Sequence, residues 1–501
     1  MTAEPGRLQR LDGANQLTRE LIGGKAHSIQ TMTSMGIPVP PAVVVTTDVC
    51  RDYHQNGRTL PDGLWGDLAD AMTYLEEVTG RRFGDPGKPL LVSVRSGAAI
   101  SMPGMMDTIL NLGLDDDVEA ALAAETGDAP FAADTRRRFV EQFRSVTGEE
   151  PPATPTGQLH LAVRAVLDSW HSPRATSYRS SRGIPDDGGT AVTVQAMVFG
   201  NLDDQSGTGV LFTRNPLSGD AEPYGEWLTR GQGEDVVSGR CDAQPLDTLE
   251  ATMPHVHRHL MEAAAAVERH GRDVQDIEFT VESGRLWLLQ SRSAKRSPQA
   301  ALRCAVHLEH AGIITVAEAL DSLTADHVRT LMAPRLDPAD VAATAPLASG
   351  KPACPGIATG VVVTDPDAAE ELADEGVDVI LARVTTDPND VAAMSSSVAV
   401  LTELGGSTSH AAVVCRELAV PCIVGCGPGT VTALAGQTVT VDATNGTVYP
   451  GALTVLDPVS AEDDALRTVT SWLRAESVDD DADVADAVTL LNRRSSKETD
   501  K

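Results

Sequence analysis

The sequence predicts a multidomain protein of mixed α/β and α+β class. At 501 residues the chain is long enough for two or three domains with complete cores. Short apolar runs bounded by glycine alternate with longer stretches of helical apolar spacing, as expected when strands and helices alternate. Apolar residues make up 42% of the chain and aromatic residues only 3%, so we expect globular domains with aliphatic cores.

The charge and the cysteines exclude several classes of function. The formal net charge is -31, whereas nucleic acids and acidic membranes bind basic surfaces, so we expect neither as a partner. The chain has no run of about 18 apolar residues and no basic and apolar leader, and we expect a cytoplasmic protein. The 7 cysteines are scattered, which argues against a disulfide framework or a zinc site. The sequence gives no indication of the oligomeric state.

The first part of the chain carries two candidate phosphate ligands. A predicted helix from residue 21 to 35 contains Lys25 directly after Gly23 and Gly24, where a lysine can reach a phosphate with little hindrance. A predicted strand over residues 90–94 leads into Arg95 and a Met-Pro-Gly-Met-Met turn, a composition suited to a mobile lid over a charged ligand. The alternatives are a solvated lysine and a loop that only crosses the core.

Helical spacing predominates over residues 114–185, and strands are expected after it. They are predicted at 191–198, 206–216 and 224–227, and residues 232–237 are expected to continue the sheet or its connections. The segment from Trp170 to Ala175, at the end of the helical stretch, is either part of a site or an ordinary capping and packing region.

Two carboxylates alternate with an apolar residue in the next strand. In a strand, Asp276 and Glu278 lie on one face while Ile277 enters the core. Because like charges repel, a cation should join them, and Mg²⁺ shared with substrate phosphates is the natural choice. Gln290 and Arg292 repeat the alternation on a following strand. The alternative is the solvated face of a two-stranded ribbon.

A histidine at a strand-turn-helix junction is the strongest single feature. An apolar strand over residues 398–402 precedes the turn at Gly405 and Gly406, and Ser407, Thr408 and Ser409 are good N-cap residues. His410 then falls in the first helical turn, where free N–H groups and the helix dipole favour an anion. A neutral imidazole there could accept a phosphoryl group. The alternative is that His410 merely begins a surface helix.

The rest of the chain is expected to connect and extend these regions. Residues 293–347 predict a helical hinge, and strands are expected near 355–363, 379–383 and 439–448. Asp387 before Pro388 is expected to cap a helix. Ser460 to Asp463 predicts a capping box that opens a helix, and packing of this helix against its own domain is favoured over docking of a partner. The apolar face of that helix consists of Leu466, Val469, Trp472 and Leu473.

Several of these motifs resemble those of pyruvate, phosphate dikinases. The resemblance covers residues 21–450 and is most specific at residues 92–113, 211–216, 231–237 and 275–280, and in Gly-Gly-Ser-Thr-Ser-His-Ala-Ala-Val-Val from Gly405. It implies an ATP-grasp domain followed by a swivelling β/β/α phosphohistidine domain. The domains implied are an ATP-grasp domain over 1–293 with a helical subdomain near 114–185, a helical linker over 294–346, a phosphohistidine domain over 347–452 and an acidic tail over 453–501.

The resemblance also implies roles for individual residues. His410 becomes the phosphocarrier, and Thr408 corresponds to a threonine whose phosphorylation regulates plant relatives. Arg383 is a candidate contact for the phosphate, and the resemblance also places the loop of residues 385–390, with Asp387, near the phosphohistidine. The implied ATP site consists of Lys25, Arg95, Asp276, Glu278, Gln290 and Arg292, with Asp276 and Glu278 also holding Mg²⁺.

We therefore expect a phosphotransferase that uses ATP and inorganic phosphate to phosphorylate its own His410, releasing AMP and pyrophosphate. Family members continue into a barrel that binds pyruvate or phosphoenolpyruvate, and residues 451–501 cannot form a barrel of ~250 residues. We expect onward transfer to pyruvate, or to another acceptor, to need a separate barrel chain. The alternative is a catalytically reduced ATP-binding protein with a regulatory or scaffold role.

Overall fold

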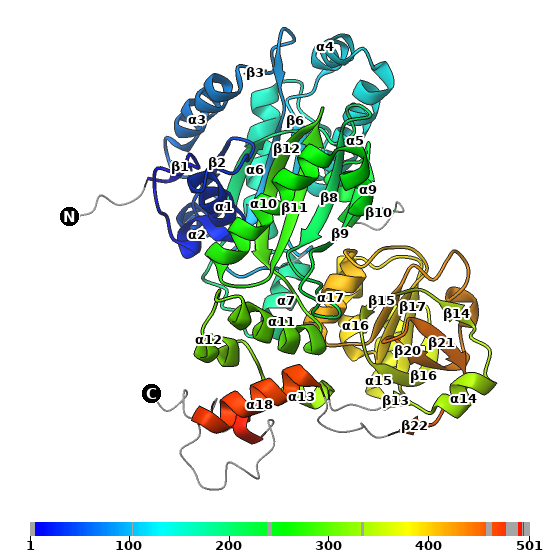
Figure 1. Cartoon of the computed structure of the whole chain (residues 1–501). Coiled ribbons are helices and arrows are strands. Elements are labelled where there is room, and N and C mark those ends of the chain that lie inside the picture. The colour runs from blue at the N-terminus through cyan, green and yellow to red at the C-terminus, as the bar shows by residue number, and fades with distance from the viewer. Residues whose placement is uncertain are drawn as a thin grey trace. The chain divides into compact units, whose positions relative to one another are not determined.

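The computed structural model describes residues 6–102, 104–237, 243–331, 335–456, 463–476, 489–492 and 494. Helices and strands alternate along the chain (Figure 1), which confirms the predicted mixed α and β class. The chain divides into two compact units. The first comprises residues 1–208, 229–232 and 278–292, and the second comprises 209–228, 233–277 and 293–501. In the described part, no helix has the length and apolar character needed to cross a membrane.

The first unit contains a five-stranded antiparallel sheet of order β1-β2-β7-β5-β6. Its strands are β1 (Leu8–Arg10), β2 (Ala42–Val45), β5 (Val92–Gly97), β6 (Thr108–Leu112) and β7 (Ala191–Ala196). Its helices are α1 (Arg19–Ser34), α2 (Thr47–Gln55), α3 (Leu64–Thr79), α4 (Asp116–Thr126), α5 (Ala129–Thr147), α6 (Pro155–Ser169) and α7 (Pro173–Arg182), and β3 (Arg82–Phe83) pairs with β4 (Pro89–Leu90). The predicted helical stretch of residues 114–185 thus forms four helices.

A second five-stranded sheet has the order β10-β9-β8-β11-β12, and the division between the units passes through it. Its strands are β8 (Gly207–Phe212), β9 (Tyr224–Thr229), β10 (Gln244–Pro245), β11 (Gln275–Glu282) and β12 (Arg285–Ser293). The helices within this part of the chain are α8 (Gly233–Val237), α9 (Asp247–Thr252) and α10 (Pro254–Gly271). Residues 232–237 therefore do not extend the sheet, because the acidic residues after Gly233 favour a helical first turn.

The second unit also contains an eight-stranded mixed sheet of order β14-β21-β20-β16-β17-β18-β19-β15. Its strands are β14 (Ala348–Ser349), β15 (Lys351–Cys354), β16 (Ile357–Val363), β17 (Val379–Arg383), β18 (Ala399–Thr402), β19 (Cys422–Val424), β20 (Thr438–Asp442) and β21 (Thr447–Pro450). Strands β16 to β19 run parallel, joined by α15 (Pro366–Asp374), the 3₁₀ turn η1 (Pro388–Asp390), α16 (Val391–Ser396) and α17 (His410–Leu418). A second 3₁₀ turn, η2 (Thr432–Leu434), precedes β20.

Strand alternation gives this sheet two cores. Val379 and Leu381 of β17 contribute to one apolar cluster, which includes Ala411 and Cys415 of α17. Ile380, the residue between them, belongs to the opposite cluster. Because successive side chains of a strand point to opposite faces, the apolar run of β17 is buried on both. Helix α17 is thereby fixed against the sheet through its apolar side.

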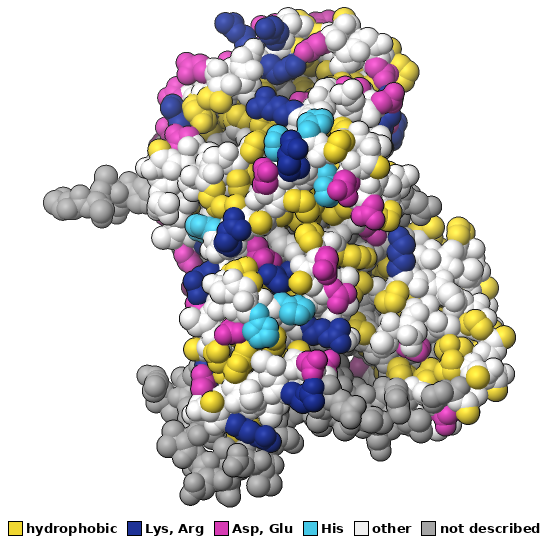
Figure 2. All heavy atoms as spheres, in the orientation of Figure 1, with side chains coloured by type: hydrophobic (Ala, Val, Ile, Leu, Met, Phe, Trp, Pro, Cys, Tyr) yellow, Lys and Arg dark blue, Asp and Glu magenta, His cyan; other side chains and the backbone are white. Residues whose placement is uncertain are grey.

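Helices precede and follow this sheet within the second unit. They are α11 (Pro298–His310), α12 (Val316–Asp321), α13 (Ala325–Leu331), α14 (Pro338–Ala343) and α18 (Asp464–Glu476), and a strand pair joins β13 (Arg335–Leu336) to β22 (Val455–Leu456). Figure 2 shows Lys and Arg side chains interspersed with Asp and Glu side chains over the face in view. On that face, among the described residues, basic charge is not gathered into one patch.

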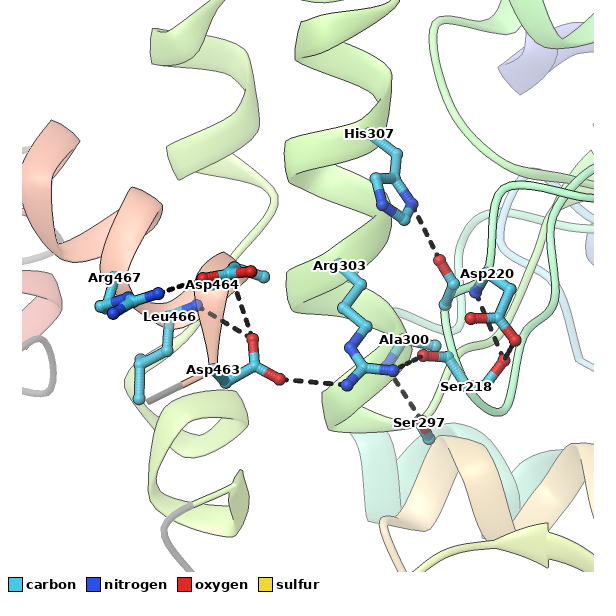
Figure 3. Close-up of polar contacts among 12 residues, drawn as sticks. Ser218, Asp220, Ser297, Ala300, Arg303, His307, Asp463, Asp464, Leu466 and Arg467 are labelled. Atoms are coloured by element: carbon cyan, nitrogen blue, oxygen red, sulfur yellow. Dashed lines mark hydrogen bonds and ion pairs between the residues drawn. The ribbon is translucent and has the colours of Figure 1, made fainter. Parts of the chain in front are cut away.

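Helix α18 packs on α11 through its apolar face, since Val469 and Leu473 are buried in the cluster that α11 forms. Figure 3 shows the polar contacts at the start of α18. The Asp463 carboxylate accepts the Leu466 N–H, and Arg303 of α11 donates to Asp463 at 3.1 Å and to the Ser218 carbonyl at 3.2 Å. The expectation that this apolar face packs within the chain is confirmed. Ser460, predicted to begin the capping box, lies outside the described residues.

Helix α1 contains a kink that brings it against β5. Gly23 has φ +72° and ψ 162° within the helix, and a Cβ atom there would lie 2.0 Å from the Gly97 carbonyl oxygen. The Gly24 N–H donates to the Ala98 carbonyl at 2.8 Å. Glycine is therefore required at position 23, directly before the segment that carries Lys25.

We predict that Gly23→Ala lowers the free energy of unfolding by about 3 kcal/mol or more, because backbone strain and a clash with Gly97 add together. Gly36→Ala is the matched control, since Gly36 has φ +73° but its Cβ would meet no atom within 4 Å. Its cost should be only about 1 kcal/mol. Urea unfolding of the two full-length variants measures the difference, and equal costs would contradict the proposed clash.

Candidate functional site

His410 occupies the first position of α17, as the turn and helix signals predict. Strand β18 ends at Thr402, and the chain turns at Gly405 with φ +113° before the helix begins. Ser409 is at the N-cap position but forms no side-chain cap bond, and its Oγ is buried without a hydrogen-bond partner among the described residues. The free amides of the first helical turn give this end of the helix a partial positive charge.

The two ring nitrogens of His410 have different surroundings. Nδ1 lies 3.1 Å from the Thr386 hydroxyl, whereas Nε2 is buried and has no hydrogen-bond partner in the described part of the chain. A small pocket adjoins the ring, lined by the hydroxyl-bearing residues Thr385, Thr386, Thr402 and Ser409 together with Leu404, His410 and Ala411. We infer that Nδ1 donates its proton to Thr386, which leaves the lone pair on Nε2.

The electrostatic surroundings favour a neutral imidazole. Burial lowers the pKa of His410, and the nearby carboxylates of Asp387 and then Asp390 act in the opposite direction. Asp387 caps the turn at Pro388, as predicted. Arg383 donates to Asp390 at 3.4 Å and to the Thr364 carbonyl at 3.1 Å. The described contacts of Arg383 thus hold the Asp387–Asp390 turn rather than the ring itself.

The residues just before His410 contact strand β9 of the same unit. The Ser407 hydroxyl lies 2.7 Å from the Tyr224 hydroxyl and donates to the Glu226 carboxylate at 3.2 Å. The Thr408 hydroxyl, which is buried, donates to Glu226 at 3.0 Å. Ser407 and Thr408 therefore do not cap α17.

The first unit contains a second charged cluster, formed by Lys25, Arg95, Glu278 and Arg292. Arg95 Nη2 lies 3.6 Å from the Glu278 carboxylate, and Arg95 Nη1 donates to Gln195 at 3.3 Å. Arg95 Nε is buried without a partner among the described residues. The pKa of Lys25 is lowered to about 7, chiefly by burial and also by Arg95 and Arg292, whereas Glu278 acts to raise it. The cationic side chains of Arg95 and Arg292 thus act on Lys25 together with the Glu278 carboxylate, and the excess of cationic groups favours an anionic ligand.

The remaining predicted residues lie on β11 and β12. Gln290 is buried on β12, two residues before Arg292 on the same face of the strand. Asp276 is buried two residues before Glu278 on β11. In the second unit, burial lowers the pKa of Arg416 on α17, while Cys354 and then Asp276 act to raise it.

Sequence comparisons identify related proteins for both regions. Residues 58–262 match the AMP/ATP-binding domain of pyruvate phosphate dikinase, and residues 376–446 match the mobile domain of PEP-utilising enzymes. A chloroplastic pyruvate, phosphate dikinase from Flaveria pringlei is 39% identical over 95% of this chain. The chain is homologous to the pyruvate, phosphate dikinases. It contains their ATP-grasp and phosphohistidine domains.

Other relatives show similar levels of identity. Pyruvate, phosphate dikinase 2 of Zea mays is 42% identical over 82% of this chain, and the pyruvate, phosphate dikinase of Rhizobium meliloti (strain 1021) is 39% identical over 92%. The chain covers 56% of the Flaveria protein, 52% of the maize protein and 60% of the Rhizobium protein. It therefore spans about half the length of the pyruvate, phosphate dikinases that it matches.

The donor set on β11 suits Mg²⁺ shared with a phosphate ligand. No group of three or more His, Cys, Asp or Glu side chains that could hold a metal ion occurs within the described ranges. Asp276 and Glu278 would provide two carboxylates, and Mg²⁺ usually binds through one or two carboxylates with phosphate oxygens and water. The residues present fit that mode of binding and not an all-protein cage.

Two contacts around His410 were not predicted from the sequence. The family resemblance places the loop at residues 385–390 near the phosphohistidine, but it does not identify Thr386 as the partner of Nδ1. Glu226 lies 182 positions before Thr408, so no local pattern connects them. The Tyr-Gly-Glu segment at Tyr224 was interpreted only as a strand. The sequence of this segment offers one signal, the carboxylate of Glu226 between Gly225 and Trp227. Strand alternation alone cannot assign that carboxylate to a site.

We predict that His410 titrates below the ordinary histidine pKa of about 6.5 and that its neutral form carries the proton on Nδ1. Long-range ¹H–¹⁵N correlation spectra of the histidine-labelled protein measure both properties, and His410→Gln identifies the signal. Asp387→Asn removes a charge that raises the pKa while keeping a capping side chain, so it should move the titration to lower pH. Titration above about 6.5, or a proton on Nε2, would contradict the inferred tautomer.

Proposed function

We propose that this chain carries out the ATP half-reaction of a pyruvate, phosphate dikinase on its own His410. Nε2 of His410 forms a bond to the β-phosphorus of ATP, the bond from that phosphorus to the α-phosphate oxygen breaks, and AMP leaves. An oxygen of inorganic phosphate then attacks the γ-phosphorus, and the bond from the γ-phosphorus to the oxygen that bridges it to the β-phosphorus breaks. The phosphate and the γ-phosphoryl group form pyrophosphate, and the β-phosphoryl group remains on His410 with the bridging oxygen.

The unpartnered Nε2 atom of His410 is the observation that supports this proposal most strongly. A buried nitrogen without a hydrogen bond loses the solvation that water would give it, and natural proteins seldom leave such atoms unsatisfied without a role. The neutral ring keeps a lone pair on Nε2 for attack. Once phosphorylated, the group would be stabilised by the amides at the start of α17 and by the surrounding hydroxyls of Thr385, Thr386 and Ser409.

The cluster around Lys25 is proposed as the phosphate-binding part of the ATP site. Lys25, Arg95 and Arg292 would neutralise charge on the phosphoryl oxygens. With a pKa of about 7, Lys25 is only partly protonated at neutral pH, and an approaching phosphate would raise that pKa and draw a proton to Nζ. Gln290 would complete the polar lining.

Asp276 and Glu278 are proposed as the magnesium ligands. When bound there, Mg²⁺ would bridge phosphate oxygens and withdraw negative charge from them. Arg95, 3.6 Å from Glu278, would keep that carboxylate oriented in the meantime.

We propose that the chain is organised as an ATP-grasp domain over residues 1–293, a helical linker over 294–346, a phosphohistidine domain over 347–452 and an acidic tail over 453–501. Phosphoryl transfer onward would go to pyruvate, the substrate named in its relatives, or to another small acceptor. That acceptor would be bound by a barrel outside the residues described here, in a separate chain as the first choice. Thr408 is proposed as a regulatory position.

The central test is labelling of the protein with [β-³²P]ATP, Mg²⁺ and inorganic phosphate. We predict acid-labile, base-stable label on the native chain and a loss of at least about a thousandfold in His410→Ala, because the nucleophile is removed. ATP binding should stay within about twofold in this variant, since His410 contacts no part of the Lys25 cluster in the proposal. His310→Ala is the control, because the His310 side chain is 63% exposed on α11.

Persistent label in His410→Ala would contradict the proposal. Absence of label on the native chain, with ATP still bound, would instead favour the alternative of an ATP-binding regulatory or scaffold protein. Loss of label in His310→Ala as well would show that the assay reports folding rather than the nucleophile.

A further inference from the structure

Glu226 of β9 is a buried carboxylate with an unusual set of hydrogen-bond donors. Its Oε1 accepts from the Ser407 hydroxyl at 3.2 Å and its Oε2 accepts from the Thr408 hydroxyl at 3.0 Å. The Tyr224 hydroxyl, two residues earlier on the strand, lies 2.7 Å from the same Ser407 hydroxyl. Residues 405–409, called here the carrier loop, are thus held by two side chains of β9 through three hydrogen bonds.

The carrier loop approaches Glu226 so closely that a side chain at position 406 would displace the Glu226 carboxylate. A Cβ atom on Gly406 would lie 2.4 Å from Oε2 and 2.8 Å from Oε1 of Glu226, and its three nearest neighbours all belong to that carboxylate. Gly406 does not have a positive φ, unlike Gly405. The close approach of the Glu226 carboxylate, and not backbone conformation, therefore favours glycine at position 406.

The contact between Glu226 and the carrier loop is of a kind that can form and break reversibly. A carboxylate that leaves water must regain its hydrogen bonds, and Glu226 does so mainly from neutral hydroxyls, with Lys351 Nζ 3.6 Å away on a half-exposed side chain. Such an exchange of water for hydroxyl donors gives a modest net stabilisation, because both states satisfy the carboxylate. The loop can therefore be held in one position and still released.

The neighbours of α17 indicate which state this contact belongs to. Arg416 of α17 donates to the Ser407 carbonyl at 2.9 Å, and its guanidinium carbon lies 5.7 Å from the centre of the Phe212 ring on β8. The Thr213 N–H, directly after β8, donates to the carbonyl of Gln275, the residue before Asp276. The carrier loop is thus docked on β9, and α17 lies near β8, the strand between β9 and β11. Strand β11 carries the proposed magnesium ligands, and Asp276 is close enough to Arg416 to oppose the lowering of its pKa by burial.

We propose that Glu226, assisted by Tyr224, is the docking site for the carrier loop in the state that receives the phosphoryl group from ATP. Glu226 is a positioning residue: it contacts neither the nucleotide nor the reacting nitrogen, and it acts by fixing Ser407 and Thr408, which precede His410. This inference rests on the proposed function, because it assumes that His410 is phosphorylated from a nucleotide bound near Asp276.

A double-mutant cycle between Glu226→Ala and Gly406→Ala tests the docking directly. Each single change should lower the single-turnover rate of His410 labelling at saturating ATP by about tenfold or more. Glu226→Ala removes the hydrogen-bond acceptor of the carrier loop, and Gly406→Ala displaces it. In the double variant, Gly406→Ala should add no further loss, because the carboxylate that it meets is absent. The KM for ATP should not change in any of these variants.

Two further variants separate positioning from general effects. Glu226→Gln keeps an acceptor oxygen and the same size, so it should retain more of the rate than Glu226→Ala. Glu222→Ala, at an exposed acidic residue just before β9, should behave like the native chain. If Gly406→Ala reduced the rate equally with and without Glu226, or if the KM for ATP rose in parallel with the fall in rate, the docking role would be refuted.

Hydrogen exchange gives a readout that does not depend on catalysis. The amides of residues 406–409 should exchange faster in Glu226→Ala than in the native chain without any nucleotide, and an unchanged rate would refute the docking. If the proposed function were wrong and the docking right, the native chain would acquire no label, but the exchange rate of residues 406–409 would still rise in Glu226→Ala. Label on the native chain with exchange insensitive to Glu226 would overturn the docking inference alone.

Discussion

The site depends on the different surroundings of the two ring nitrogens of His410. The Thr386 hydroxyl fixes Nδ1 of His410, and Nε2 is left buried without a partner among the described residues. Burial disfavours the imidazolium, while Asp387 and Asp390 limit how far the pKa falls. Two neighbouring parts of the fold hold the ring in this position. Strands β17 and β18 bury the apolar side of α17. The turn at Pro388 follows Thr386, whose hydroxyl contacts the ring. In the proposed reaction, this arrangement would give a nucleophile that keeps its lone pair at neutral pH at the electropositive end of a helix.

The two charged features of the chain complement each other in the proposed reaction. Lys25, Arg95 and Arg292 gather positive charge around Lys25, with Glu278 close to Arg95, so the first unit is suited to an anion. Glu226 has the opposite character, since it is a buried carboxylate whose hydroxyl donors come from the carrier loop. A strong ion pair in that place would hold the loop more permanently, whereas hydroxyl donors allow exchange with water. In the proposed reaction, the two sites would thus separate tight binding of phosphates from reversible positioning of the carrier.

Local patterns predicted the parts of the site that are local. The apolar run of β18, the glycines and the helical spacing placed His410 in the first turn of α17, and the alternation in β11 placed Asp276 and Glu278 on one face. The N-cap prediction was only partly right, because Ser407 and Thr408 are bonded to Glu226 and Ser409 forms no cap bond. That competition depends on a strand about 180 residues away, which no turn signal reveals. Thr386 and the kink at Gly23 likewise gain their meaning only from tertiary neighbours, and residues 232–237 formed a helix where a sheet extension was one expectation.

The most direct test of the account is to follow the β- and γ-phosphorus atoms of ATP separately through a single turnover with Mg²⁺ and inorganic phosphate. Attack at the β-phosphorus predicts that β-label remains on His410, that γ-label appears in pyrophosphate, and that AMP forms in the same amount as phosphohistidine. Transfer of γ-label to His410 with release of ADP would contradict the account, since it would make this chain an ordinary γ-phosphoryl kinase acting on its own histidine.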